Sequence, residues 1–193
     1  MTLLQALRNA TQASHQQLDR QISQEESTAS RQSYARYLER FHRGLAACWP
    51  KLDWALLAKL ELPELPARQA RYHALTADLQ ALGHPVPKLE MGIEGEQAAS
   101  TVGSLYVLEG SIHGGAILLS ELEKNAGPQP ANTSGFMRGF GDQNRSYWKD
   151  FTSWLESLDT GEDFQKLASA SAVEAFERFT TAFGAESPTA ASR

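Results

Sequence analysis

The residues best suited to chemistry in this chain begin with a histidine in the first predicted helix. His15 is followed one helical turn later by Asp19, which can accept the proton of one ring nitrogen and leave the other free to bind a metal. Arg8 projects from the same helix face two turns earlier and is suited to binding a carboxylate. The alternative is a buried core histidine that its neighbours satisfy by hydrogen bonds. The spacing therefore predicts either an axial metal ligand or a core histidine at position 15.

A second set of candidates lies in an apolar helical segment, residues 101–122, which carries four glycines. Each glycine inside a helix costs roughly 1 kcal/mol relative to alanine. Gly103, Gly110 and Gly114 are spaced to fall along one helix face. Such a face presents bare backbone either to another helix or to a planar ligand. His113 adds an imidazole, either beside whatever the glycines admit or on the polar flank of a helix interface.

Composition limits the partners that this chain can have. It has 193 residues, with 18 basic and 23 acidic side chains and a net charge of −5, which argues against nucleic acid or an anionic membrane as the main partner. Glu109, His113 and Glu121 interrupt the apolar segment, so it is not predicted to span a membrane. Cys48 is the only cysteine, which excludes an internal disulfide and a cysteine-clustered metal site. No secretory signal is visible, so a cytoplasmic location is expected.

Helices must position these residues, because no stretch shows the sustained period-two alternation of strands. Apolar residues recur at helical spacing, and Pro50, Gly83 and Pro85 punctuate the pattern. The predicted helices cover residues 2–22, 33–49, 67–82, 96–124, 143–158 and 164–183, with a short turn at 54–60 and irregular segments at 23–30, 85–94 and 125–141. We therefore predict an all-α, single-domain helical bundle over residues 1–183 and a flexible C-terminal tail over residues 184–193.

Two motifs resemble the haem oxygenase family, most closely its bacterial branch, which includes enzymes that accompany bacteriophytochromes. The first motif, LRNATQASH at residues 7–15, is similar to the proximal helix of the family. The second, GSLYVLEGS at residues 103–111, is followed by two further glycines and is similar to the distal helix. The resemblance implies a haem oxygenase, in which haem is both substrate and cofactor and the ring is opened to biliverdin with release of carbon monoxide and iron.

The resemblance assigns the proximal and propionate-binding roles to individual residues. It implies that His15 is the proximal ligand of the haem iron and that Asp19 hydrogen-bonds this histidine. Arg8 matches a basic position that faces a haem propionate. Arg145 and Lys149, one helical turn apart, resemble the basic pair that binds propionates in relatives.

On the distal side, the resemblance implies that the backbone of Gly110 and Gly114 touches the haem and lets the helix bend, with Gly103 on the same haem-facing stripe. Many members have an aspartate after the first distal glycine, where this chain has Ser111. We assign the Ser111 hydroxyl, together with ordered water, to the supply of protons. His113 stands where a hydrophobic residue is more usual, and it could bind iron as a sixth ligand or hold water.

The resemblance also implies partners and leaves alternatives. Molecular oxygen and an external electron donor, a ferredoxin or a reductase, are expected because the chain has no flavin or iron–sulfur motif. A bacteriophytochrome that accepts the product is a further partner by analogy with relatives. Three other interpretations are a haem carrier or sensor without turnover, a thiamin-pathway hydrolase of the same architecture, for which Cys48 is poorly placed as nucleophile, and a structural protein whose glycines pack helices.

Overall fold

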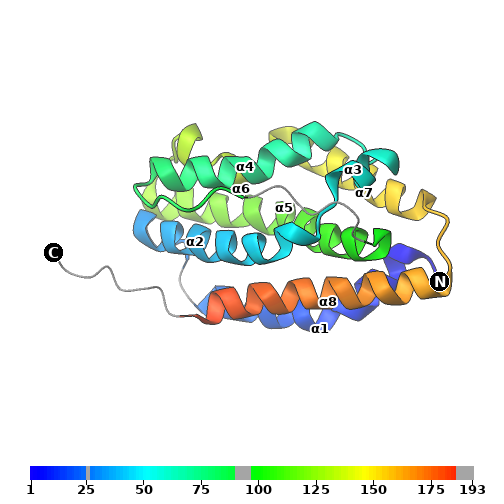
Figure 1. The fold of residues 1–193 in the computed structure, drawn as a ribbon. Helices are drawn as coiled ribbons and strands as arrows, with labels where there is room; N and C mark the ends of the chain where they lie inside the picture. The colour runs from blue at the N-terminus through cyan, green and yellow to red at the C-terminus, as the bar shows by residue number, and fades with distance from the viewer. Residues whose placement is uncertain (25–26, 90–96, 186–193) are drawn as a thin grey trace.

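A computed structural model describes residues 1–24, 27–89 and 97–185, and every regular element in these ranges is a helix (Figure 1). The α-helices in chain order are α1 (Leu3–Gln24), α2 (Arg31–Cys48), α3 (Trp54–Lys59), α4 (Leu65–Ala81), α5 (Ala98–Ala126), α6 (Gly135–Arg138), α7 (Asn144–Ser157) and α8 (Glu162–Gly184). Single turns of 3-10 helix occur at η1 (Trp49–Lys51), η2 (Ala131–Thr133) and η3 (Gly141–Gln143). The predicted all-α, single-domain class is confirmed.

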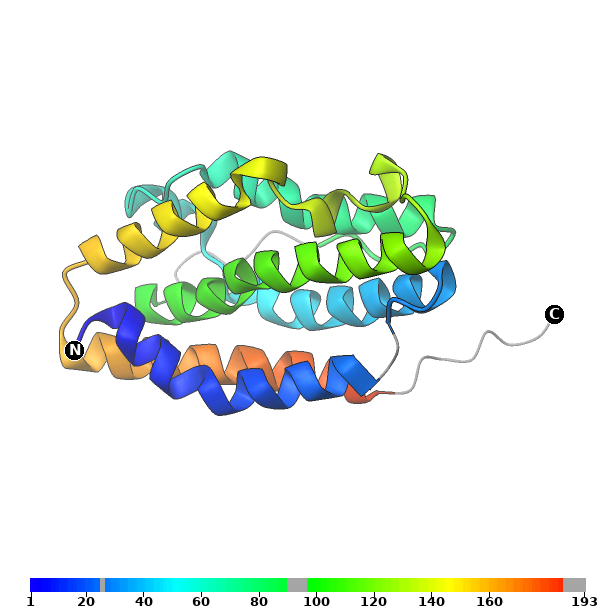
Figure 2. The ribbon, with the colours of Figure 1, turned by 180° about the vertical axis from the view of Figure 1, so that it is seen from behind.

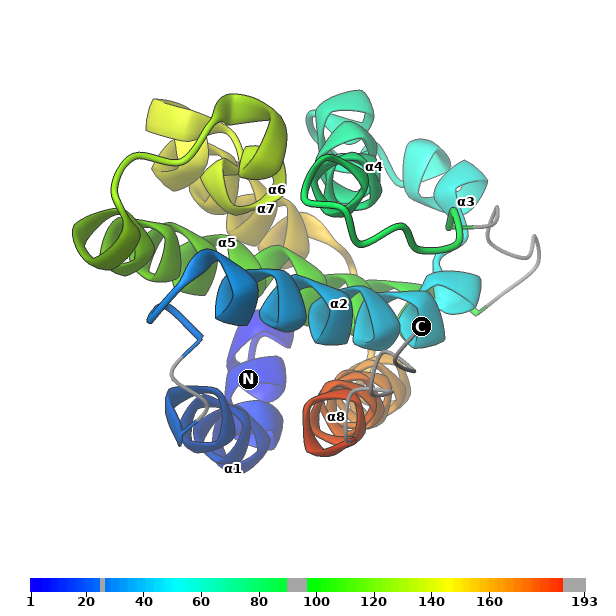
Figure 3. The same ribbon diagram turned by 90° about the vertical axis from the view of Figure 1, so that its left-hand side faces the viewer.

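The helices form three layers when the bundle is viewed end-on (Figure 3). One outer layer consists of α1 and α8, the middle layer of α2 and α5, and the other outer layer of α3, α4, α6 and α7. Helix α8 packs extensively on α1, α2 and α5, so it joins the first outer layer to the middle layer. From behind, α5 is seen above α1 (Figure 2). The two helices that carry the sequence motifs therefore belong to neighbouring layers.

Helix α5 is the central helix of the fold. Among the described residues it is the helix that is long and apolar enough to cross a membrane by length and composition, but 56% of its apolar window is buried inside the protein. Val102, Leu105 and Leu108 are fully excluded from solvent, and the charged Glu109 is buried with them. The apolar character of this segment is thus used to pack neighbouring helices onto it.

Local sequence explains where the first two helices begin. Thr2 and Gln5 cap α1 reciprocally, since the Gln5 amide donates to the Thr2 hydroxyl at 3.3 Å and the Thr2 amide donates to the Gln5 side chain at 3.0 Å. Ser30 and Ser33 form the equivalent capping box at α2. At the other end of the chain α8 ends at Gly184, and most of the predicted tail, residues 186–193, lies outside the described residues.

A short helix, α3, occupies the segment where the sequence predicts only a turn. Asp53 precedes α3 and its carboxylate accepts the Leu56 amide at 2.9 Å, which is a standard helix N-cap. The segment therefore begins a helix, which ends after six residues at Lys59.

A second short helix, α6, lies inside the segment predicted as irregular. Its first two amides, at Gly135 and Phe136, donate to the two carboxylate oxygens of Asp78 on α4 at 3.1 and 2.8 Å. These hydrogen bonds oppose the burial that raises the pKa of Asp78. The prediction of a loop here is wrong because the capping residue lies 57 positions away in the sequence, outside any local pattern.

Candidate functional site

A cavity of about 580 Å³, open to solvent on one side, is lined by residues of α1, α2, α5, α7 and α8. Its volume lies in the range of small-molecule and cofactor sites. Aromatic side chains form much of its wall, namely Tyr37, Phe41, Tyr106, Trp148, Phe176, Phe179 and Phe183. The few polar groups among them include His15, Asp19 and Ser111. Both sequence motifs thus contribute to one site that suits a largely apolar ligand with a few fixed polar contacts.

His15 lines this cavity from α1, and its side chain is 60% exposed. The alternative of a buried core histidine is therefore excluded. The imidazole Nδ1 lies 2.9 Å from Oδ2 of Asp19, and the ring stands edge-on to Phe176 of α8, with centroids 5.7 Å apart. The described residues place no hydrogen-bond partner on Nε2. The ring is held in place by two neighbours while one nitrogen stays available to a ligand.

The glycine stripe of α5 divides into two parts with different surroundings. A Cβ at Gly110 would meet only Trp148 Cη2, at 3.9 Å, and a Cβ at Gly114 would meet nothing within 4 Å; both residues line the cavity. A Cβ at Gly103 would instead overlap the carbonyl group of Ala168 on α8. The expectation that Gly103 faces a ligand is therefore wrong, because it packs two helices together. Bare backbone faces the cavity only at Gly110 and Gly114.

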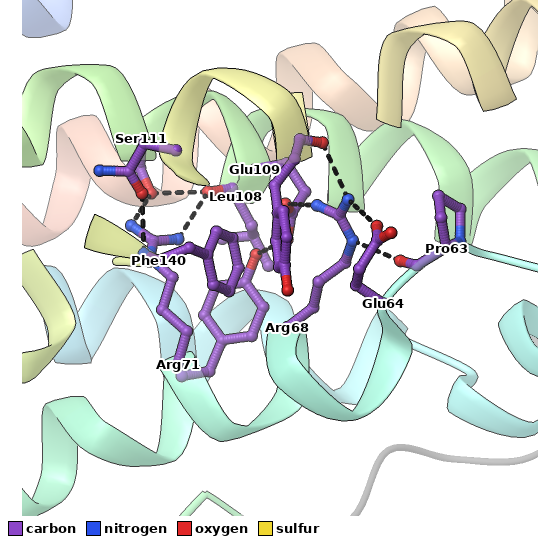
Figure 4. Close-up of polar contacts among 11 residues, drawn as sticks. Pro63, Glu64, Arg68, Arg71, Leu108, Glu109, Ser111 and Phe140 are labelled. Atoms are coloured by element: carbon purple, nitrogen blue, oxygen red, sulfur yellow. Dashed lines mark hydrogen bonds and ion pairs between the residues drawn. The ribbon is translucent and has the colours of Figure 1, made fainter. Parts of the chain in front are cut away.

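The polar wall of the cavity is formed by Ser111, with a buried arginine behind it (Figure 4). The Ser111 hydroxyl donates to the Leu108 carbonyl at 2.6 Å and accepts from Arg71 Nη2 at 3.0 Å. Arg71 is 4% exposed, and its guanidinium lies over the rings of Phe136 and Tyr72 at 4.4 and 5.5 Å. Within the described part of the chain, no carboxylate pairs with Arg71 and its Nε has no hydrogen-bond partner. The site thus holds a buried positive charge that the sequence analysis missed.

His113 lines the cavity beside the two open glycines. Its ring packs edge-on against Trp148 of α7, with centroids 5.2 Å apart and an interplanar angle of 83°. Burial lowers the pKa of His113 below its usual value of 6.5, so the imidazole is neutral at pH 7. A neutral ring can accept a hydrogen bond or bind a metal through one nitrogen.

The predicted propionate-binding cations lie at or outside the rim of the cavity. Arg8 is exposed and lies near Tyr106, which lines the cavity; burial raises the pKa of the Tyr106 phenol, and the nearby Thr11 and Arg8 side chains partly oppose this. Arg145 and Lys149 are exposed on α7, and neither is among the residues that line the cavity. The structure therefore brings Arg8 to the site through Tyr106, which the sequence analysis did not single out, and leaves the other pair on the surface of α7.

The interpretation as a thiamin-pathway hydrolase needs a nucleophilic cysteine, which the structure does not provide. Cys48 is 1% exposed, its Sγ lies 4.0 Å from the Ala175 carbonyl, and burial raises the pKa of the thiol to about 12. Such a thiol is not a nucleophile at neutral pH, which removes the basis for a cysteine-dependent hydrolase.

Across residues 1–24, 27–89 and 97–185, no group of three or more His, Cys, Asp or Glu could hold a metal. A histidine such as His15, in a cavity without a cluster of further protein ligands, fits a metal whose other ligands belong to a macrocycle.

Fold and site together define an all-helical protein with an aromatic-walled cavity between a histidine-bearing helix and a glycine-bearing helix. The sequence profile of the heme oxygenase family matches residues 50–185. The chain is 32% identical to heme oxygenase PigA of Pseudomonas aeruginosa, over 91% of this chain and 88% of that protein. It is 33% identical to a heme oxygenase of Xanthomonas campestris, over 80% of this chain and 90% of that protein. The chain belongs to the haem oxygenase family.

Solved structures show the same architecture. The NO- and CO-bound heme oxygenase of Neisseria meningitidis aligns over 98% of both chains with a TM-score of 0.76 and 25% identity. The heme oxygenase of Leptospira interrogans aligns over 95% of this chain and 98% of that chain, with a TM-score of 0.70. At 18% identity the second likeness concerns the fold alone.

Proposed function

We propose that this haem oxygenase binds haem edge-in in the cavity between α1 and α5, with His15 Nε2 as the iron ligand on one side and the backbone of Gly110 and Gly114 on the other. The observation that carries the proposal is the shared cavity. His15, whose Nδ1 contacts Asp19, lines this cavity from α1. Gly110 and Gly114 line it from α5, and no atom of another helix lies closer than 3.9 Å to the position that a Cβ would take at either glycine. Haem bound there supplies an iron that activates oxygen and a ring that is opened to biliverdin, with release of carbon monoxide and iron.

The residues of the proximal side orient the imidazole of His15. Asp19 accepts the Nδ1 proton of His15, which directs Nε2 toward the ligand and makes the ring a better donor. Phe176 fixes the plane of the ring from α8. A neutral histidine donates less charge to iron than a thiolate does, which suits a reaction on the ring rather than immediate oxygen–oxygen cleavage.

The distal side is largely apolar and places the Ser111 hydroxyl in its wall. Gly110 and Gly114 let the backbone come close to a bound ring, and the aromatic side chains would shield that ring from water. At Ser111 the hydroxyl proton is engaged with the Leu108 carbonyl, so the oxygen offers an acceptor lone pair to an ordered water. Arg71 polarises that hydroxyl from behind. In this proposal Ser111 and Arg71 together hold the water that delivers protons, and Ser111 alone is not the proton donor.

The orientation of the ring is set at the rim. Arg8 and the hydroxyl of Tyr106 lie together there and offer N–H and O–H donors suited to a propionate carboxylate. Arg145 and Lys149 are exposed on α7 and do not line the cavity. To bind the second propionate, their side chains must turn toward the cavity beside Trp148. Regiochemistry would then follow from how these contacts rotate the ring within the cavity.

The reaction needs electrons from outside the chain, and the same proposal takes them from a ferredoxin or a reductase. Cys48 is the only cysteine and is buried, which leaves no cysteine set for an iron–sulfur cluster. A bacteriophytochrome as acceptor of the product and a cytoplasmic location belong to the proposal as well. Both are supported by the family resemblance and by the overall composition.

A haemin titration tests the proposal. Addition of haemin to the wild-type protein should produce a sharp Soret band that is altered in His15→Ala and unchanged in His73→Ala, an exposed histidine on α4 that packs on Trp49 outside the cavity. With oxygen and a ferredoxin–reductase system, the wild-type Soret band should then disappear as biliverdin forms. The proximal assignment is wrong if the two alanine variants behave alike. A stable Soret band under reducing, aerobic conditions would identify a haem carrier instead.

A further inference from the structure

The Arg68 guanidinium joins three helices at one buried point (Figure 4). Its Nη1 pairs with Glu109 of α5, its Nη2 donates to the Tyr147 carbonyl of α7 at 2.9 Å, and its Nε donates to the Pro63 carbonyl before α4 at 2.7 Å. The rings of Phe140, Tyr147 and Phe151 surround the group at 5.9, 5.8 and 5.4 Å. A guanidinium presents its donors in a rigid planar fork, so a shift of either α5 or α7 would break a hydrogen bond.

Both of these partners stand next to residues of the cavity wall. Glu109 directly precedes Gly110, and Tyr147 directly precedes Trp148. The two walls come close there, since a Cβ at Gly110 would lie 3.9 Å from Trp148 Cη2. Helix α7 packs on α5 much less extensively than α8 does. The separation of these two walls therefore depends strongly on the contact through Arg68.

The energetics point to geometry rather than to stability as the purpose of this ion pair. Arg68 and Glu109 are both fully excluded from solvent, and a buried pair of charges often contributes no more than well-packed apolar side chains would. The second oxygen of Glu109 accepts from the Tyr72 hydroxyl at 2.6 Å, so the carboxylate is satisfied on both sides. A shift of α5 or α7 relative to α4 would leave at least one of these buried donors or acceptors unpaired.

We propose that Arg68 is a positioning residue that sets the separation of Gly110 and Trp148 through Glu109 and the Tyr147 carbonyl, and thereby the width of the cavity on its distal side. The effect on haem rests on the proposed function, because this width decides how closely the distal backbone can lie on the ring. The effect on the two walls exists in the ligand-free protein and does not depend on that function.

Arg68→Lys tests the inference in the full-length, ligand-free protein. Lysine keeps the positive charge, but a single ammonium group cannot hold both helices in the planar fork geometry. Labelling with 5-fluorotryptophan gives one ¹⁹F NMR resonance for each of the four tryptophans, and Trp148→Phe assigns the one of interest. We expect the Trp148 resonance to shift or split in Arg68→Lys. Trp154, on the same helix but hydrogen-bonded to the Leu60 carbonyl at 2.7 Å, should keep its position.

Glu64→Gln is the matched control. Glu64 lies 3.3 Å from the Arg68 guanidinium, but it belongs to neither α5 nor α7 and so does not connect Arg68 to a wall of the cavity. All four tryptophan resonances of Glu64→Gln should therefore keep their wild-type chemical shifts. A Trp148 resonance unchanged in Arg68→Lys, or an equal shift of all four resonances, would overturn the positioning role. If Arg68→Lys does not fold, Glu109→Gln replaces it, since the amide keeps an acceptor but removes the charge. A selective Trp148 shift in that variant supports the proposal and an unchanged one overturns it.

Haemin dissociation is the second readout on the same proteins. We expect haemin to leave Arg68→Lys about tenfold faster than wild type, while Glu64→Gln releases it at the wild-type rate. Equal rates for the two variants would contradict a role of the wall separation in haem binding. Failure of the wild-type protein to bind haemin would instead contradict the proposed function, and the ¹⁹F spectra would still decide the role of Arg68.

Discussion

Two glycines on one face of α5 should respond in opposite ways to alanine. Gly103 lies against α8, where a Cβ would be 2.9 Å from the carbonyl carbon of Ala168 and would overlap its oxygen. Gly114 opens on the cavity, where a Cβ would meet nothing within 4 Å. Both residues lie inside one continuous helix, so each alanine gains the same helix propensity of roughly 1 kcal/mol. The two substitutions differ only in what surrounds the added methyl group.

The magnitudes follow from these surroundings. At Gly103 the obstacle is backbone, which cannot rotate away, so α5 and α8 must separate. Overpacking costs about 1–3 kcal/mol, and a backbone obstacle places this site in the upper part of that range, at about 2–3 kcal/mol. The propensity gain of roughly 1 kcal/mol then leaves a net loss of about 1–2 kcal/mol. At Gly114 only the propensity gain is left, so Gly114→Ala should raise the free energy of unfolding of the ligand-free protein by about 0.5–1 kcal/mol.

Two measurements on each variant separate packing from ligand binding. Urea unfolding of the ligand-free protein, followed by far-ultraviolet circular dichroism, gives the change in free energy of unfolding. Haemin titration gives the affinity. The methyl group of Gly114→Ala projects into the space proposed for haem, so haemin affinity should fall at least about tenfold. Gly103→Ala should bind haemin with nearly wild-type affinity once the folded fraction is taken into account.

The outcome for Gly114 decides whether the reasoning stands. A Gly114→Ala protein that is less stable than wild type without haemin, or that binds haemin as tightly as wild type, would refute the assignment of this glycine to the ligand face. A Gly103→Ala protein as stable as wild type would refute the direct packing of this glycine on α8.

Three further predictions concern the polar residues. Ser111→Ala should retain haemin binding but form biliverdin at least about tenfold more slowly in a ferredoxin–reductase assay, because the water held by Ser111 and Arg71 is lost; an unchanged rate would exclude the hydroxyl from the reaction. Asp78→Asn should lower the free energy of unfolding by about 1–2 kcal/mol in urea, because one of the two α6 amides loses its acceptor and the other keeps only a neutral one; wild-type stability would show that this cap contributes nothing. His42 is 5% exposed and burial lowers its pKa below 6.5, so the unfolded chain binds more protons than the folded chain as the pH falls. The free energy of unfolding should therefore decrease below pH 6.5 in wild type and decrease less in His42→Gln, and equal slopes from roughly pH 7 to pH 5 would contradict this.

Helical periodicity was enough to predict the order of the long helices, because apolar residues recur at helical spacing along them and Pro50, Gly83 and Gly127 follow the ends of α2, α4 and α5. The contact of His15 with Asp19 was predictable for the same reason, since residues four apart on a helix are neighbours. What the periodicity could not show was that the His15 side chain is largely exposed. An apolar stripe looks the same whether it faces the core or a cavity.

Contacts between helices lay beyond the sequence. Arg68 with Glu109 and Arg71 with Ser111 are separated by 41 and 40 residues, and only the packing of α4 on α5 brings them together. The prediction that Gly103 faces the ligand was wrong for a related reason. It shares a face with Gly114, but eleven residues of helix place the two about 16 Å apart along the axis, where different helices are their neighbours.

Helix α1 is anchored unevenly, and this has a consequence for how occupancy of the cavity can be detected. Its first turns are buried through Leu3, Leu4, Leu7 and Thr11, whereas every residue from Gln12 to Ser23 is partly or fully exposed. The later turns, which carry His15, should therefore open by local unfolding at a lower free energy than the rest of the bundle. A ligand bonded to His15 must dissociate before those turns can open, and at one hundred times its dissociation constant it adds about 2.7 kcal/mol to that cost. Amide hydrogen exchange in this half of α1 would then record haem binding as slower exchange, with no change in the fold.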